Sequence, residues 1–270
     1  MTPRLSSTLR LVAAASVVLG AALWTARPGE AHKAVTSKYF FNEHIFPLVR
    51  DKCGRCHVEG GVAPMSLMTY DDAAPWGESL RLELLADSAP PWHPLALTAR
   101  ETDMLLVWAT GGTPRGSLDT VLPPVPLVNT WGSGTPDVAL KMPAPFVLAG
   151  AVNDATHEVV LPLTGAAARA ISAVDLLPGQ PAMVRSATLL LKSADGATRE
   201  LASWLPGRGA AVPLATPVVV SNGSSLVARL LYKRTWKYEG QDLTDASTVG
   251  LYFAAAGAKP TSGKVPAPLP

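Results

Sequence analysis

The sequence predicts two folded parts of different class, a small helical domain followed by an all-β antiparallel sandwich of jelly-roll-like form. Between residues 33 and 118 apolar side chains recur at helical spacing, whereas short β-prone runs separated by turn signals follow residue 131. A proline-rich stretch separates the two patterns. We therefore expect a multidomain chain of the α + β type.

The first 31 residues have the pattern of an export signal. Two arginines precede an apolar run over residues 11–24, which is shorter than the ~20 residues that a membrane-spanning helix needs. Gly29 and Ala31 are small enough for a cleavage site, and cleavage there leaves His32 at the mature N-terminus. An uncleaved signal anchor, which would associate the protein with the membrane, is the alternative. We expect an exported protein, periplasmic or at the outer face of the cytoplasmic membrane.

The composition excludes some classes of protein. Charged residues make up 16% of the chain and hydrophobic residues 48%, so it is not an acidic disordered protein. The net charge is +2, and removal of the expected signal leaves twenty basic and twenty acidic residues. Since no run of lysine or arginine occurs, we expect no nucleic-acid partner.

Three helices are expected in the first part, over residues 39–49, 69–85 and 98–109. Asp71 and Asp72 favour the N-terminal dipole of the second helix. The segment 89–94 ends this helix, because its prolines cannot continue the hydrogen-bond ladder. Thr98 and Glu101 have the spacing of a capping box at the start of the third helix.

The strands of the second part are short and follow one another closely. The β-prone runs are residues 159–163, 170–177, 187–192, 217–220, 226–232 and 249–254. Pro-Gly, Asp-Gly and Asn-Gly pairs separate several of them, which is typical of an antiparallel sandwich. We place a signal peptide at 1–31, the helical domain at 32–116, a Pro-rich linker at 117–130, the sandwich at 131–256 and a Pro-rich tail at 257–270.

Both cysteines of the chain lie in the pentad Cys53-Gly54-Arg55-Cys56-His57. C-x-x-C-H is the attachment signature of c-type haem, since two thiols one helical turn apart reach both vinyl groups and the imidazole turns under the iron. A disulfide and a redox dithiol are the alternatives. A zinc site would need a second cysteine or histidine pair, which the sequence lacks. We expect one covalently bound haem c, held by Cys53, Cys56 and His57, with His57 as the proximal iron ligand.

Further short sequence motifs precede the end of the helical domain on the C-terminal side of the pentad. They are Ala63-Pro64-Met65-Ser66-Leu67, Thr69-Tyr70, Pro75-Trp76, Pro90-Pro91-Trp92 and Trp108. With the pentad they cover most of residues 40–116, and the combination resembles the haem c domains in front of proteins of the copper type II, ascorbate-dependent monooxygenase family. The resemblance implies a cytochrome c-like fold for the first part of the chain.

The second part resembles the first β-sandwich half of the same family. The matching marks are Trp131, Gly134, Pro136-Asp137, Met142-Pro143, Pro178-Gly179, Trp204, Pro206-Gly207, Asp245 and Gly250-Leu251. Where copper-bearing relatives have three histidine ligands, this chain has Arg185, Ser186 and Leu231. His157 is the only histidine in residues 119–270, and one imidazole does not hold a catalytic copper. We therefore expect no copper, and we interpret His157 as a surface or strand-end residue.

The distal iron ligand is the open question of the sequence. Related domains have a methionine just before Pro-Pro-Trp, whereas this chain has Ala89. His93, four residues later, is the leading candidate for the distal iron ligand, and an open or water-bound position is the alternative. We interpret the methionines Met65, Met68 and Met104 as packing residues, His44 as a solvated helix residue and His32 as a frayed chain end.

The favoured interpretation is an exported monohaem cytochrome that carries electrons. The sandwich then serves as a docking or assembly module in a larger redox complex, and the partner is a redox protein or a membrane-associated complex. Two alternatives stay open. One is an oxidoreductase that acts on a small molecule through a five-coordinate haem or a copper held by His32. The other is a structural subunit whose haem is incidental.

Overall fold

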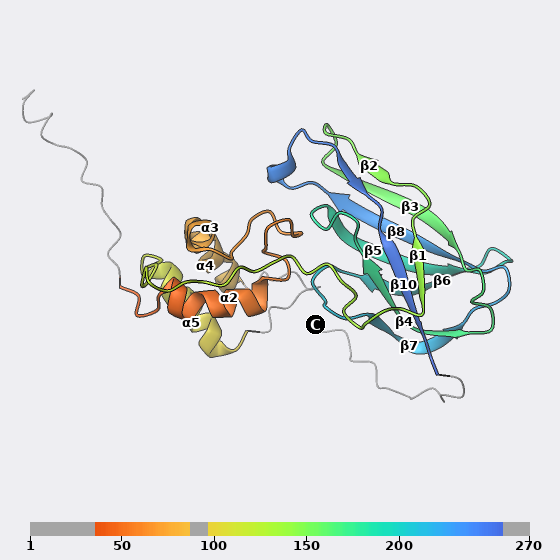
Figure 1. Cartoon of the computed structure of the whole chain (residues 1–270), viewed down its shortest axis with the longest axis horizontal. Helices are drawn as coiled ribbons and strands as arrows, with labels where there is room; N and C mark the ends of the chain where they lie inside the picture. Colours follow the sequence, from red (N-terminus) through yellow and green to blue (C-terminus); the bar gives the residue numbers. More distant parts are fainter. Residues whose placement is uncertain (1–35, 87–96, 256–270) are drawn as a thin grey trace, which may run out of the picture. The chain divides into compact units, whose positions relative to one another are not determined.

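The computed structural model describes residues 36–86 and 97–255. A small helical region is followed by antiparallel sheets that pack as a sandwich, so the predicted fold class is confirmed (Figure 1). The expected signal, His32, the segment with Ala89 and His93, and the whole of the expected tail lie outside the described residues. No helix in the described ranges combines the length and apolar character needed to span a bilayer.

The chain enters the helical region through a π-helical turn, Phe41–Ile45, that runs directly into α2, Phe46–Cys53. Proline in the first turn of α2 is tolerated because the amide hydrogen there has no intrahelical partner. The ring nitrogen Nδ1 of His44 accepts a hydrogen bond from the amide of Phe40 at 3.2 Å. His44 therefore satisfies an amide at the start of the helical segment.

The expected second helix is divided. The structure has α3 (Tyr70–Ala73), a 3₁₀ turn (Ala74–Trp76) and α4 (Gly77–Ala86) in its place. The break occurs at Pro75, which supplies no amide donor to an α-helical ladder. Gly77 follows the break, and a β-carbon there would lie 2.5 Å from Cγ2 of Thr113. Glycine thus lets α4 approach the segment that follows the next helix.

The third predicted helix is confirmed as α5, Ala99–Thr110, and its predicted capping box is present. Oγ1 of Thr98 accepts from the Glu101 amide at 3.3 Å, and the Thr98 amide donates to Glu101 Oε2 at 2.7 Å. Two donors that no intrahelical carbonyl can reach are satisfied in this way.

Replacing Thr98 with alanine is expected to lower the free energy of unfolding of the helical region by about 1 kcal/mol, because one helix-terminal amide loses its acceptor. Denaturant titration followed by far-ultraviolet circular dichroism measures this loss. Thr110→Ala, at the opposite end of α5, is the matched control and should change the stability much less. Equal losses from both variants would contradict the capping role.

The helical core is built around aromatic side chains. Its buried members are Phe41, Ile45, Phe46, Val49, Val58, Leu67, Met68, Ala73, Leu105, Trp108 and Ala109. The indole Nε1 of Trp108 donates to the Pro114 carbonyl at 3.1 Å. Leu122, Val125 and Leu127 of the expected linker pack against this core, so the linker is held by apolar contacts to the helices.

The sandwich contains two four-stranded sheets in the described residues, with every strand pair antiparallel. One sheet has the order β1 (Val138–Lys141), β10 (Thr248–Phe253), β4 (Ala170–Leu177) and β7 (Val212–Val219). The other has the order β3 (Asp154–Pro162), β8 (Ser225–Lys233), β5 (Val184–Lys192) and β6 (Thr198–Trp204). A small pair, β2 (Phe146–Leu148) and β9 (Leu243–Asp245), completes the described strands. The core lies between the two larger sheets and draws its apolar side chains from both of them.

Asp245 is completely buried in this sandwich and accepts four hydrogen bonds. Oδ1 accepts from the Gln180 amide at 2.8 Å. Oδ2 accepts from the hydroxyl of Tyr232 at 2.9 Å, and from the amide and hydroxyl of Ser247 at 3.1 and 2.8 Å. Burial, and then the charge of Asp245, raise the pKa of the Tyr232 hydroxyl. The phenol is therefore a constant donor at neutral pH.

A buried arginine fixes the loops at the same side of the fold. The guanidinium of Arg234 donates to carbonyls of Leu148, Ala149 and Val152 at 3.2, 2.6 and 3.1 Å. It also donates to the carbonyls of Tyr238, at 2.7 Å, and Gln241. Backbone oxygens thus satisfy the charged group and join loops far apart in sequence.

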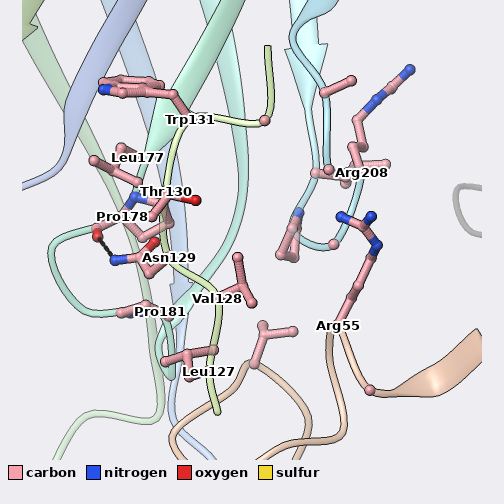
Figure 2. Close-up of a pocket in the computed structure, with 18 of the residues that line it drawn as sticks. Arg55, Leu127, Val128, Asn129, Thr130, Trp131, Leu177, Pro178, Pro181 and Arg208 are labelled. Carbon is pink, nitrogen blue, oxygen red and sulfur yellow. Dashed lines mark hydrogen bonds between the residues drawn. The ribbon is translucent and has the colours of Figure 1, made fainter. Parts of the chain in front are cut away.

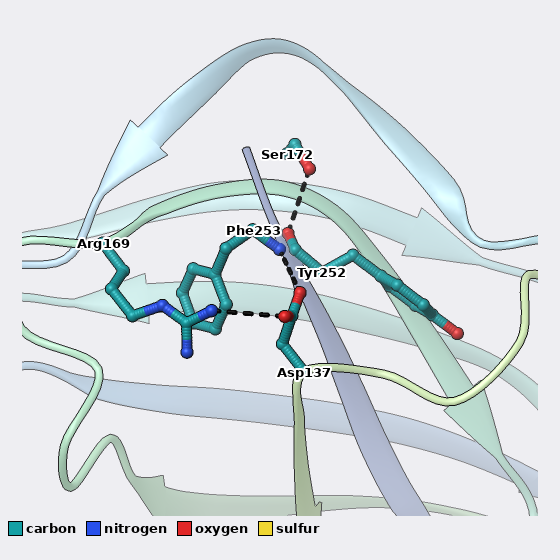
Figure 3. A network of polar contacts seen from close by, with 5 residues as sticks. All are labelled: Asp137, Arg169, Ser172, Tyr252 and Phe253. Atoms are coloured by element: carbon teal, nitrogen blue, oxygen red, sulfur yellow. Dashed lines mark hydrogen bonds and ion pairs between the residues drawn. The ribbon is translucent and has the colours of Figure 1, made fainter. Parts of the chain in front are cut away.

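An ion-paired network secures one end of strands β1, β10 and β4 in the first sheet (Figure 3). The carboxylate of Asp137 accepts from the Phe253 amide at 2.8 Å and pairs with Arg169 at 3.2 Å. The Arg169 guanidinium lies 3.8 Å from the centroid of the Phe253 ring. Ser172 donates to the carbonyl of Tyr252 at 3.1 Å. These contacts occur where the ladders of β4 and β10 shift register, so side chains stabilise the irregular strand ends.

Candidate functional site

The two thiols and the imidazole of the pentad are brought together by one turn of backbone. Cys53 is the last residue of α2, and its carbonyl accepts from the amides of Cys56 at 3.1 Å and His57 at 2.8 Å. Both cysteines are half-buried and neither is in a disulfide. The local structure therefore presents two separate thiols and one imidazole within a single turn.

The glycine-rich segment after His57 folds back onto this turn. The Ala63 amide donates to the Cys56 carbonyl at 3.1 Å, and the Leu67 amide donates to the His57 carbonyl at 3.0 Å. Gly60 has a φ of 75°, a backbone conformation that favours glycine. A β-carbon on Gly61 would lie 2.5 Å from the Cys56 carbonyl oxygen. Glycine at both positions thus lets the loop close against the cysteines.

The ring of His57 is oriented by a backbone carbonyl. Its Nδ1 lies 3.2 Å from the carbonyl oxygen of Met65, and because a carbonyl only accepts, Nδ1 carries the proton. Burial lowers the pKa of His57, and the bond to Met65 opposes this effect. At neutral pH the ring is therefore uncharged with a lone pair on Nε2, the state that binds a metal ion.

Burial raises the pKa of both thiols. Burial raises the pKa of Cys53 to about 11, with a smaller contribution from Cys56. Burial also raises the pKa of Cys56, while the positive charges of Arg185 and Arg55 oppose the rise. Reactive dithiols have a lowered pKa, since the thiolate is the nucleophile. The site therefore lacks the acidity that favours a redox dithiol.

Several other sulfur and imidazole groups among the described residues have structural contacts of their own. Met68 is buried in the helical core, and Met65 and Met104 pack against it. His157 lies within β3, half-buried, and its ring stacks on Phe146 at 4.7 Å between centroids. Among the described residues, no three histidine, cysteine, aspartate or glutamate side chains converge as a metal site.

The three positions that the resemblance assigned to copper ligands are neighbours in the second sheet. Ser186 on β5 lies opposite Leu231 on β8, and Arg185 is the extra residue of a bulge between Val184 and Ser186. Leu231 points outward and is 41% exposed. The positions are therefore brought together, but they present a guanidinium, a hydroxyl and an alkyl group.

A pocket of about 540 Å³ lies beside the pentad. Figure 2 shows its lining: Leu127 to Trp131 pass along it, with Pro178 and Pro181 at one side and Arg55 and Arg208 at the other. Asn129 donates to the Pro178 carbonyl at 2.8 Å and so ties this segment to the sandwich. Neither this pocket nor a second one of about 300 Å³ is lined by the cysteines or His57.

Two features of the site were not singled out from the sequence. One is the Met65 carbonyl that orients His57, since a backbone oxygen has no signature in a residue pattern. The other is the positive charge of Arg185, which opposes the rise in the pKa of Cys56. These residues are more than a hundred positions apart, and no local pattern joins them.

Comparisons with known proteins assign this chain to no family. No family model and no curated protein matches it. Among solved structures, one chain of an infectious bursal disease virus particle, "Structure of infectious bursal disease virus Gx strain", is 15% identical. The match spans 55% of this chain and 38% of the viral chain, with a TM-score of 0.19. Similarity at that level carries no argument about fold or function.

Proposed function

We propose that the protein is an exported cytochrome that carries single electrons on one haem bound covalently to Cys53 and Cys56, with His57 as the proximal iron ligand. The observation that carries this proposal is the hydrogen bond from His57 Nδ1 to the Met65 carbonyl. It directs the lone pair of the imidazole to Nε2 beside two thiols that share no disulfide. Neither a disulfide nor a redox dithiol requires an imidazole fixed in this tautomer.

The residues present fit a c-type haem. Cys53 and Cys56 would form the two thioethers, and His57 would bind the iron through Nε2. The haem supplies a reversible one-electron change between ferric and ferrous iron. The chain contributes a fixed imidazole and a loop closed by Gly60 and Gly61 that shields one side of the attachment turn. These are the tasks of an electron carrier, which needs a rigid site that changes little between oxidation states.

The sandwich is proposed to dock this carrier to a redox protein or a membrane-associated complex. Its interior is filled by apolar side chains, and the buried Asp245, Tyr232 and Ser247 within it are hydrogen-bonded to one another. Its surface exposes apolar groups suited to a partner, among them Trp236 at 63% and Leu231 at 41%. Because the chain without its signal has balanced charges, shape and apolar contact would determine docking more than long-range steering.

The visible spectrum of the purified protein tests electron transfer against catalysis. A six-coordinate, low-spin haem that is reduced reversibly and does not bind carbon monoxide is the expected result. A high-spin haem that binds carbon monoxide, or stoichiometric copper, would contradict it and favour the oxidoreductase. His93→Ala is expected to change the low-spin spectrum if His93 is the distal ligand, with His44→Ala as the control.

The alternative hypothesis, a structural subunit whose haem is incidental, predicts a different result. A variant without the pentad cysteines would then assemble with its partner and still support the electron flux of the complex. If the partner complex forms but electron flux is lost, the haem has the proposed function.

A further inference from the structure

The turn that joins β7 to β8 contains the one asparagine of this chain that is followed by glycine. The chain has four asparagines, and the other three precede glutamate, threonine and aspartate. Glycine has no side chain, so its amide nitrogen can approach the carboxamide of a preceding asparagine without steric hindrance. Asn222-Gly223 is therefore the pair whose carboxamide is most open to attack by the backbone that follows it.

The fold leaves both reacting groups of this pair accessible. Asn222 and Gly223 are exposed, and Gly223 has a φ of 74°. The turn is closed by a hydrogen bond from the Ser224 amide to the Ser221 carbonyl at 3.2 Å. Within residues 36–86 and 97–255, neither the Gly223 amide nor the Asn222 carboxamide has a protein partner for a hydrogen bond. The amide nitrogen is thus free to lose its proton to water and to turn towards the carboxamide.

A second turn in the sandwich, which contains Asp195-Gly196, shows the opposite arrangement. Aspartate followed by glycine can form the same kind of ring through its carboxyl group. Here the Gly196 amide donates to the Ser193 carbonyl at 2.9 Å, and Oδ1 of Asp195 accepts from the Ala197 amide at 3.0 Å. Because hydrogen bonds occupy both the nitrogen and the carboxylate, this turn is protected in the folded protein.

The other asparagines lack the combination of a free carboxamide and a following glycine. Asn42 and Asn129 each donate from Nδ2 to a backbone carbonyl, at 2.7 and 2.8 Å. Asn153 is exposed, but the side chain of Asp154 hinders the amide that follows it. Sequence and structure therefore single out Asn222.

We propose that Asn222 is a site of spontaneous deamidation in the folded protein. The Gly223 nitrogen, once its proton has passed to water, attacks Cγ of Asn222 and closes a cyclic succinimide. The bond from Cγ to Nδ2 breaks, and this nitrogen leaves as ammonia. Water then opens the ring at either of its carbonyls, which gives aspartate or isoaspartate. The reaction consumes only water and does not depend on the proposed function.

The modification changes both the charge and the backbone of the turn. Either product adds a negative charge, and isoaspartate also inserts a methylene into the main chain. The turn leads directly into β8, which pairs with both β3 and β5. Aged copies of the chain would thus carry a more acidic turn beside a central strand of the second sheet.

Incubation of the purified protein at mildly alkaline pH and physiological temperature tests the proposal. Peptide mass spectrometry should find that the peptide with Asn222 gains the mass difference between a carboxamide and a carboxylic acid. An isoaspartyl methyltransferase should label the same peptide. Asn222→Gln should stay unlabelled, because its longer side chain does not close this ring readily. The peptides with Asn129 and Asn153 are internal controls and should stay unchanged over the same period.

Comparison with the chain unfolded in guanidinium chloride separates the folded turn from the bare sequence. Asn222 should lose its amide at comparable rates in both states, whereas isoaspartate at Asp195 should form only after unfolding. Gly223→Ala should slow the loss roughly tenfold or more in both states, because a β-carbon hinders the attacking nitrogen. A native protein that keeps Asn222 intact while the unfolded chain loses it would overturn the proposal. Equal rates in Gly223→Ala and the wild type would also overturn it.

Discussion

Replacing both Cys53 and Cys56 with alanine is expected to abolish covalently bound haem. The two thiols lie in one turn whose amides bond to the Cys53 carbonyl, and no other cysteine exists in the chain. A thioether cannot form without them, and His57 alone would leave the cofactor free to dissociate. Haem staining of a denaturing gel, after expression with a cytochrome c maturation system, measures the loss.

The pentad offers its own control for that experiment. Arg55→Ala changes an exposed residue between the cysteines and leaves both thiols and His57 in place, so haem staining should persist. The sandwich core contains neither cysteine, and its thermal unfolding should be unaffected in the double variant. Full haem staining of the double alanine variant would disprove the assignment of the pentad.

Asp245→Ala is expected to lower the free energy of unfolding of the sandwich by about 3–5 kcal/mol. The change removes a fully buried acceptor and leaves the Tyr232 hydroxyl, the Ser247 hydroxyl and the Gln180 amide without their partner. Each unsatisfied buried donor costs about 1–3 kcal/mol, partly recovered by relaxation. Urea denaturation followed by tryptophan fluorescence measures the difference.

Asp154→Ala is the matched control for this buried carboxylate. Asp154 is exposed at the start of β3, and surface substitutions of this kind change stability by about 0.5 kcal/mol or less. A loss for Asp245→Ala no larger than that of the control would show that the four hydrogen bonds contribute little. Haem content should be the same in both variants, because neither residue belongs to the pentad.

The helices and strands that the sequence predicts correctly are those whose residue pattern lies within a short stretch of the chain. Thr98 and Glu101 identify the start of α5 because a capping box is complete within four residues. β4 was expected over residues 170–177 and is found there. β1, β2 and β9 were not expected, since strands of three or four residues are too short to establish an alternating pattern. β6 was also not expected, because its first half is exposed and polar.

Some features of the candidate site can likewise be predicted from the sequence, and others cannot. Cys53, Cys56 and His57 are contiguous, so their spacing alone indicates the chemistry. The orientation of His57 depends on a loop that returns to it eight residues later and presents a backbone oxygen. The positive charge that opposes the rise in the pKa of Cys56 comes in part from Arg185, which lies at a strand bulge more than a hundred residues later in the chain. Distance in sequence and the absence of a side-chain signature explain why these features required the structure.

The mass of the exported wild-type protein tests the central proposal most directly. Mass spectrometry of the peptide that contains Cys53 to His57, purified after expression with a cytochrome c maturation system, should find it heavier by one haem, with both cysteines modified. Iron content should be one per chain. A peptide with two unmodified thiols, or with a disulfide between Cys53 and Cys56, would contradict the proposal that this turn attaches a haem.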